Sequence, residues 1–213
     1  SELPDPRSGP GQVLVRIHAA GVNFVDALLI GGKYQIRIPP PFVPGGDCAG
    51  TVVATGAGIT EFAPGERVLA SPGIGAYAEL ITLAPAQLAR MPANMGFAGA
   101  AVFLQANATA YFALVNRGAL RAGETLLVLG AAGGTGAAAV QLGKALGARV
   151  IAAASSADKL EACRALGADV LIDYAARDLR AELKEATGGR GVDVVFDPVG
   201  GALAEPALRS CAE

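Results

Sequence analysis

The stretch with the clearest chemical potential is the glycine-rich run GAAGGTG at residues 130–136. It follows a compact apolar run at 125–129 and precedes a helical pattern over 137–146, and a second apolar strand begins at Arg149. Strand, glycine turn and helix in this order bind dinucleotide phosphates, because glycines let the backbone approach the pyrophosphate and the helix N-terminus offers unpaired N–H groups. The alternative is a tight helix–sheet junction. We interpret the run as a cofactor loop.

The spacing of these glycines differs from the usual G-x-G-x-x-G fingerprint. Ala131 stands at the first position, Gly133 and Gly136 fill the other two, and Gly130 comes just before. This weakens the match to the fingerprint but suits a slightly different turn.

The end of the second strand bears on the choice of cofactor. An NAD-binding fold usually places Asp or Glu there, to bind the ribose 2′-hydroxyl. This chain has Ser155 and Ser156 instead, with Lys159 one turn further on. A 2′-phosphate would fit hydroxyl donors and an ammonium group. The serines could also cap the next helix, with Asp158 in its first turn. We expect NADP(H) rather than NAD(H).

The sequence gives little support for a metal site or for a catalytic nucleophile. The single histidine, His18, falls on the outward face of a predicted strand, where a solvated or hydrogen-bonded side chain is the expected role. Three cysteines lack C-x-x-C spacing, so no zinc site is expected. No G-x-S-x-G motif is present either. The remaining chemistry is hydride transfer, which a nicotinamide cofactor carries.

Composition sets the class of protein. The chain has 213 residues, 52% hydrophobic and 17% charged, enough to bury the core of one large domain or two small ones. Its formal net charge of −2 gives no case for binding nucleic acid or an anionic membrane. The odd number of cysteines indicates reduced thiols in a cytoplasmic protein. Two long uncharged stretches, 91–116 and 125–143, are interrupted by polar residues or glycines, so we interpret them as buried elements.

The first half of the chain predicts an all-β unit. Strands are expected at 12–19, 50–54, 67–70 and 76–82, separated by Pro/Gly turns, which is typical of a barrel or sandwich. A helix is expected at 23–30, with Phe24 and Leu28 facing inward.

The second half alternates strands with helices, which predicts a parallel, doubly wound sheet. After a helical region at 96–116, strands are expected at 125–130, 149–154, 169–172 and 192–196, and helices at 134–146, 157–166 and 179–187. We place the domains at 1–105 and 106–213. Four parallel strands are fewer than the six of a full dinucleotide fold, so we expect a fragment, or a chain completed by another.

In combination, these segments resemble the zinc-independent medium-chain dehydrogenases/reductases, specifically the NADPH:quinone oxidoreductase (zeta-crystallin-like) group. The resemblance covers nearly the whole chain. It rests on AGVNFVD (20–26), GKY (32–34), PGGDCAG (44–50), TAY (109–111), the glycine run 130–136, Lys159, LGAD (166–169) and GVDVVFDPVGG (191–201).

The resemblance implies a fold and the absence of the zinc ligands that related enzymes carry. A GroES-like catalytic β domain (1–105) would precede an incomplete Rossmann NADP-binding domain (106–213), with the active site between them and further strands beyond residue 213. Zinc-dependent relatives carry a cysteine at the position of Asn23 and Gly-His-Glu at 45–47, so both metal ligands are replaced here. The full-length form would be a homodimer acting on a small quinone or enone.

It also implies site residues. Asn23 and Tyr34 would line the cleft for substrate and nicotinamide, with Tyr34 as a proton donor. Tyr34 could equally pack on the prolines at 39–41, and Asn23 could be a helix N-cap with Asp26 in a capping box. The cofactor contacts would be Thr109, Gly133, Gly134, Thr135, Gly136, Ser155, Lys159, Tyr174, Val199 and Gly200. Asn107-Ala108 before Thr109 departs from the family pattern.

The sequence therefore predicts an NADPH-dependent, metal-free reductase of quinones or other conjugated carbonyls. An enoyl-thioester reductase on the same fold is the nearest alternative. A nucleotide-binding module without turnover, as an NADPH-bound structural protein or an RNA binder, is the alternative from another class, although the low net charge argues against RNA.

Overall fold

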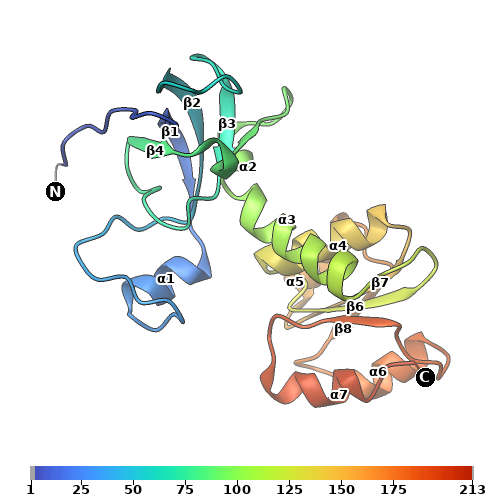
Figure 1. Cartoon of the computed structure of the whole chain (residues 1–213). Helices are drawn as coiled ribbons and strands as arrows, with labels where there is room; N and C mark the ends of the chain where they lie inside the picture. The colour runs from blue at the N-terminus through green and yellow to red at the C-terminus, as the bar shows by residue number, and fades with distance from the viewer. Residues whose placement is uncertain (1–2, 213) are drawn as a thin grey trace. The chain divides into compact units, whose positions relative to one another are not determined.

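The computed structural model describes residues 3–212, which divide between Gln105 and Ala106 into two compact units, unit 1 before this point and unit 2 after it. Figure 1 traces them from blue to red along the chain, with the strands β1 to β4 in unit 1 and β6 to β8 in unit 2. In the described range, no helix is both long enough and apolar enough to cross a membrane.

Unit 1 is built on a five-stranded antiparallel sheet in the order β4-β1-β2-β3-β5. The strands are β1 (Val13–Gly21), β2 (Asp47–Thr55), β3 (Arg67–Ala70), β4 (Leu80–Leu83) and β5 (Leu88–Arg90). The predicted alternation holds in β1, because Val13 and Val15 are buried against Val52 and Val68 while His18 is exposed.

Two strand predictions in unit 1 need correction. The expected strand at 76–82 is β4 at Leu80–Leu83, because Ala76 and Tyr77 instead donate backbone hydrogen bonds to the carbonyls of Gly45 and Pro44. β5 was not predicted, since three residues are too few to show a period of two.

The helix predicted at 23–30 forms as α1 (Phe24–Ile30), but the expected buried face is wrong. Phe24 is 79% exposed and Asp26 is 3% exposed. Apolar periodicity cannot identify this face, because the helix buries a carboxylate that is held by hydrogen bonds.

The predicted helical region at 96–116 forms three successive pieces. These are α2 (Phe97–Ala101), α3 (Phe103–Tyr111) and a π-helical segment, η2 (Phe112–Arg117). Val102 separates the first two with φ −109° and ψ 3°. The last residue of unit 1, Gln105, lies on α3. Unit 1 also contains a short 3-10 helix, η1 (Pro85–Gln87).

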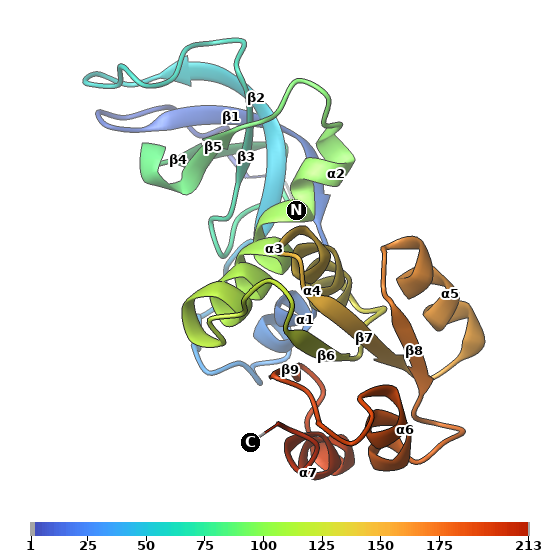
Figure 2. The same cartoon turned by 90° about the vertical axis from the view of Figure 1, so that its right-hand side faces the viewer.

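Unit 2 contains a four-stranded parallel sheet in the order β8-β7-β6-β9 (Figure 2). Its strands are β6 (Thr125–Leu129), β7 (Arg149–Ala154), β8 (Val170–Asp173) and β9 (Val194–Phe196). The helices are α4 (Gly134–Ala145), α5 (Ala157–Ala165), α6 (Leu179–Ala186), η3 (Gly201–Leu203) and α7 (Ala204–Leu208). The doubly wound prediction is confirmed, whereas η3 and α7 were not foreseen.

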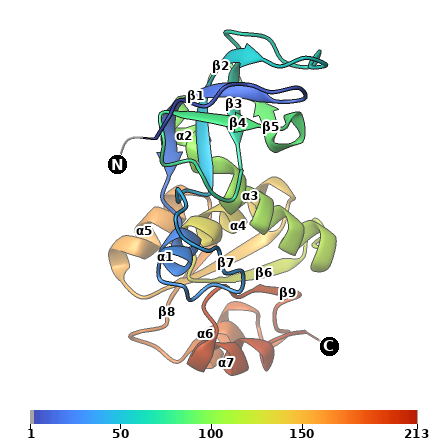
Figure 3. The same ribbon diagram turned by 60° about the vertical axis from the view of Figure 1, so that its left-hand side comes forward.

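Helices cover both faces of this sheet, with α3 and α4 on one side and α6 and α7 on the other (Figures 2 and 3). Alternate strand residues supply the two cores. Leu126 and Val128 pack with Ala139 and Val140 of α4, whereas the intervening Leu127 and Leu129 pack with residues of α6 and α7. Because both faces are buried, the strands appear in the sequence as continuous apolar runs.

Candidate active site

The glycine-rich run forms the predicted turn between β6 and α4. Gly133 is the N-cap residue of α4, and Gly134 is its first residue. A Cβ on Gly136 would lie 2.3 Å from the carbonyl oxygen of Gly130 and 2.8 Å from Cα of Ala131, so only glycine lets the helix pack this closely on the loop. A Cβ on Gly134 would meet nothing within 4 Å. The helix N-terminus is thus open at a position where a phosphate could approach.

The loop lies where the order of the sheet reverses. The chain moves from β6 through β7 to β8 in one direction, and then returns to place β9 on the other side of β6. Val199 lies beyond β9 and packs toward Gly130, where an added Cβ would be 2.7 Å from Val199 Cγ2. The backbone N–H groups of Val199 and Gly200 both donate to Asp197 Oδ1, at 2.9 and 2.8 Å. Ligands of doubly wound sheets bind at this reversal.

The residues predicted for the 2′-phosphate lie together at the same edge. Lys159 Nζ donates to Ser155 Oγ at 2.9 Å, so an ammonium and a hydroxyl form one polar pair after β7. Ser156 stands at the N-cap position of α5, where the alternative interpretation placed a serine, but its side chain makes no capping hydrogen bond. The N–H of Tyr174 donates to the carbonyl of Ala154, which places Tyr174 at this edge as well.

Thr109 is an exposed residue of α3. No hydrogen bond within residues 3–212 joins Thr109 to the glycine-rich loop, so its predicted role beside the nicotinamide stays a prediction.

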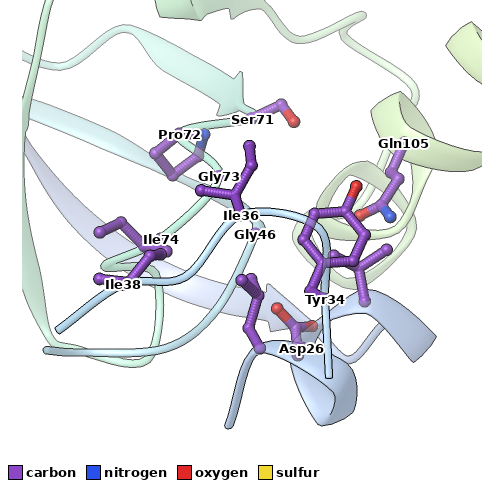
Figure 4. Close-up of a pocket in the computed structure, with 12 residues that line it drawn as sticks. Asp26, Tyr34, Ile36, Ile38, Gly46, Ser71, Pro72, Gly73, Ile74 and Gln105 are labelled. Carbon is purple, nitrogen blue, oxygen red and sulfur yellow. The ribbon is translucent and has the colours of Figure 1, made fainter. Parts of the chain in front are cut away.

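Unit 1 contains a mainly apolar pocket of about 390 Å³ (Figure 4). Tyr34 lines it, as expected for a substrate cleft, beside the polar residues Asp26, Ser71 and Gln105. The remaining wall is apolar or backbone and comes from Val25, Leu29, Ile36, Ile38, Gly46, Pro72, Gly73 and Ile74. A lining of this kind suits an apolar molecule with few polar groups.

A hydrogen-bond network holds Asp26 at the wall of this pocket. Asp26 Oδ2 accepts from the backbone N–H of Asn23 at 2.8 Å and from the hydroxyl of Tyr77 at 3.0 Å. The Tyr77 hydroxyl also lies 3.3 Å from the Gly21 carbonyl. Burial and the hydrogen bond to Asp26, with its charge, raise the pKa of Tyr77. Tyr77 therefore remains a protonated donor at neutral pH.

Asn23 is not among the residues that line the pocket. It is the N-cap residue of α1, and its Nδ2 donates to Asp47 Oδ2 at 3.3 Å. Asp47 is 1% exposed, and its Oδ1 has no hydrogen-bond partner in the described part of the chain. The expected direct role of Asn23 toward substrate thus remains a prediction, whereas its capping position is what the structure shows.

Three residues of the site were missed at the sequence level. Asp26 was noted only as a capping residue, and nothing in the sequence pairs it with Tyr77, 51 positions away. Gln105 lies in the middle of an uncharged helical stretch that predicted only burial. For Asp26 a signal existed, since a carboxylate inside an apolar helical pattern is rarely buried without a partner.

The donor set does not fit a zinc ion. Residues 3–212 contain no group of three or more His, Cys, Asp or Glu side chains that could hold a metal. His18 is on β1, with its Nε2 3.1 Å from Thr51 Oγ1 and its ring packed against that of Phe97 at an angle of 39°. Burial, together with the charge of Asp47, raises the pKa of Cys48 to about 11, so this thiol stays neutral.

Comparison with known protein families covers both units. Residues 9–93 match the family described as "Alcohol dehydrogenase GroES-like domain", and residues 134–213 match the family described as "Zinc-binding dehydrogenase". The predicted independence from zinc stays a prediction.

Individual relatives agree with this assignment. The quinone oxidoreductase-like protein 2 homolog of Nematostella vectensis is 38% identical over 206 residues, which cover 96% of this chain and 56% of that protein. Among solved structures, an NAD-dependent alcohol dehydrogenase superposes with a TM-score of 0.95 at 36% identity, covering 100% of this chain and 70% of that one. The Escherichia coli quinone oxidoreductase, solved with NADPH, gives 0.89 at 32% identity, covering 100% and 65%.

The chain thus spans little more than half the length of that curated relative. Its antiparallel unit, its parallel sheet and its glycine-rich turn are nevertheless all matched in order. The chain belongs to the medium-chain dehydrogenase/reductase family of oxidoreductases.

Proposed function

We propose that this chain is an NADPH-dependent, metal-free oxidoreductase that reduces quinones or other conjugated carbonyls by hydride transfer. The observation that carries the proposal is the edge of the unit 2 sheet, where an open helix N-terminus and the Lys159–Ser155 pair follow neighbouring strands β6 and β7. NADPH, when bound, would supply the hydride.

The residues of unit 2 would hold the cofactor by its phosphates. Gly133, Gly134, Thr135 and Gly136 offer backbone N–H groups at the start of α4 for the pyrophosphate. Ser155 and Lys159 would bind the 2′-phosphate, Tyr174 would lie near the adenosine, and Val199 and Gly200 beside the nicotinamide. The proposed fit to a 2′-phosphate is supported by the hydroxyl of Ser155 near the position where NAD-binding folds have a carboxylate, and by the Lys159 ammonium group 2.9 Å from it.

The neighbours support a nicotinamide cofactor but differ over which one. The Escherichia coli quinone oxidoreductase was solved with NADPH, whereas the neighbour with the TM-score of 0.95 is described as NAD-dependent. The local chemistry of this chain favours NADPH, because Ser155 and Lys159 offer donors to a phosphate and no carboxylate to the ribose.

The unit 1 pocket would hold the substrate, with Tyr34 as the proton donor. Its apolar wall would exclude water from an aromatic or enone body. A phenol hydroxyl can hydrogen-bond to the substrate oxygen or protonate the atom that gains charge when the hydride arrives.

The Tyr34→Phe variant tests this assignment. Turnover of a conjugated carbonyl, followed by NADPH absorbance, should fall about 10- to 100-fold, because a general acid contributes at least this much, while NADPH affinity stays unchanged. Tyr111→Phe, at an exposed tyrosine of α3, is the matched control. An unchanged rate in Tyr34→Phe would reduce Tyr34 to a packing residue.

A further inference from the structure

Three hydrogen-bond acceptors of the unit 1 pocket wall come together around Gly46. A Cβ placed on Gly46 would lie 3.5 Å from Gln105 Oε1, 3.6 Å from Asp26 Oδ1 and 3.8 Å from the Gly73 carbonyl oxygen. We call the part of the pocket wall where these three oxygens surround Gly46 the Gly46 niche. Figure 4 shows Asp26, Gly46, Gly73 and Gln105 around the pocket together with Tyr34.

The carboxylate of Asp26 is fixed with one oxygen toward the niche. Its two described hydrogen bonds, from the Asn23 N–H and the Tyr77 hydroxyl, both end on Oδ2. Oδ1 is the oxygen that approaches Gly46. Asp26 is only 3% exposed and lines the pocket. Water can therefore reach Oδ1 only from the pocket side.

A cluster of acceptors of this kind favours ligand groups that donate hydrogen bonds over groups that do not. A carboxylate oxygen and a backbone carbonyl can only accept, and the Gln105 amide can turn its oxygen to accept as well. A hydroxyl group entering the niche would donate to Asp26 Oδ1, whereas an alkyl group of the same size would leave these acceptors unpaired and desolvated.

We propose that the Gly46 niche receives a hydrogen-bond donor of the substrate, so that the preferred substrates are conjugated carbonyl compounds that also carry an alcohol hydroxyl. The reduction of these substrates rests on the proposed function, whereas their binding in the pocket does not depend on it. Gly46 and Asp26 are specificity residues in this account, and Tyr34 remains the residue assigned to the carbonyl.

Two probes of nearly equal size test the proposal, 2-hydroxymethyl-1,4-naphthoquinone and 2-ethyl-1,4-naphthoquinone. Their binding to the 213-residue chain is measured by calorimetry without NADPH, and their reduction is measured with NADPH. The hydroxymethyl compound should bind about tenfold tighter or better, since a hydrogen bond to a charged group is worth about that ratio.

Gly46→Ala should abolish this preference. The added methyl group would lie among the three acceptors at ordinary contact distances of 3.5–3.8 Å, so it would cover them without a clash. Gly99→Ala in α2, where nothing lies within 4 Å of the added Cβ, is the matched control and should keep the preference. Gln105→Leu, which removes one acceptor at similar size, should weaken the preference and serves if Gly46→Ala does not fold.

The outcomes separate the two claims. Equal binding and equal turnover of both probes would overturn the niche and leave the proposed reaction standing. A preference in binding without NADPH oxidation would support the niche and contradict the reaction. Failure of both probes to bind, or a preference that persists in Gly46→Ala and Gln105→Leu, would overturn the inference.

Discussion

Lys159 and Ser155 are the two side chains on which the proposed choice of cofactor depends. Their 2.9 Å hydrogen bond turns the ammonium group toward the end of β7, where the second ribose of a dinucleotide would lie. Lys159 is exposed and Ser155 is half-buried, so a phosphate could reach both.

Lys159→Ala should weaken NADPH binding about 10- to 100-fold, because one charge-assisted hydrogen bond to the 2′-phosphate would be lost. NADH affinity should hardly change, since NADH carries no phosphate there. Fluorescence titration with both nucleotides measures the ratio. Lys184→Ala on α6, another exposed lysine, is the matched control. Equal losses for NADPH and NADH would exclude the 2′-phosphate assignment.

At this scale, sequence reasoning succeeded where a contact between side chains follows from local spacing. Ser155 comes just before the N-cap of α5 and Lys159 lies in its first turn, four residues later, so their proximity could be predicted. Asp26 and Tyr77 could not be paired, because their contact depends on a nonlocal path of the chain between α1 and the segment before β4. The buried carboxylate of the pocket therefore emerged only with the structure.

The glycine-rich turn is the element that places α4 against the sheet. Its two inner glycines have different tasks: Gly136 permits close packing on Gly130 and Ala131, and Gly134 leaves the helix N-terminus open. The sequence alone predicts the same role for Gly134 and Gly136, whereas the atoms around each glycine show that their roles differ.

Gly136→Ala should destabilise unit 2 by about 1–3 kcal/mol, as expected for overpacking, because the new methyl group would clash with backbone atoms. Gly134→Ala should leave stability unchanged and weaken NADPH binding, since its methyl group would occupy the approach of the pyrophosphate. Urea unfolding and nucleotide titration of both variants separate these effects. Equal stability of the two variants would contradict the packing argument.

A second link joins α4 to the start of the β8 region. Lys144 Nζ lies 2.7 Å from Asp169 Oδ1, and the N–H of Val150 donates to Asp169 Oδ2 at 2.6 Å. Burial alone would raise the pKa of Asp169, but the hydrogen bonds from Lys144 and Val150 and the charges of Lys144 and Arg149 outweigh it and lower this pKa. The ionised carboxylate thus stabilises the folded state.

Asp169→Asn should cost about 1 kcal/mol at pH 7, a modest value because both side chains of the pair are about a third exposed. The folded pKa is lowered, so this stabilisation is complete above the unfolded pKa of about 3.9 and is lost as the pH falls through the folded pKa. Urea unfolding at pH 7 and at successively lower pH should show the difference shrinking. Glu185→Gln, at an exposed residue of α6, should show no such trend. A difference independent of pH would contradict the assignment.

The elements themselves were predictable where periodicity is long. The buried strands β6 and β7 and the helices α4 to α6 follow from continuous apolar runs, turn residues and helical spacing. β5 and α7 were missed because they have three and five residues, and α7 contains Pro206. Short elements of this kind are fixed by their neighbours rather than by their own sequence pattern.

At the scale of the whole molecule, the two units divide the proposed task. Unit 1 contains the pocket with Tyr34, and unit 2 contains the glycine-rich turn and the polar pair. Hydride transfer would require both, so it tests the account as a whole. The predicted homodimer of the full-length form and the cytoplasmic location stay predictions.

The order of the units could be read from the sequence because each has its own pattern, alternating short strands first and strand–helix repeats afterwards. The limited number of parallel strands was also predicted, and β9 pairs only with β6 among the described strands. What the sequence could not provide is the polarity of the pocket wall, which depends on side chains from four separate segments.

The most direct test of the central claim follows the hydride itself. The chain is incubated with a conjugated enone and NADPH deuterated at either the 4R or the 4S position, and the product is analysed by NMR and mass spectrometry. One of the two cofactors should deliver a single deuterium to the β-carbon, and the other none, because a protein site presents one face of the nicotinamide. A reduced product without deuterium from either cofactor, or no reduction at all, would contradict hydride transfer by this chain.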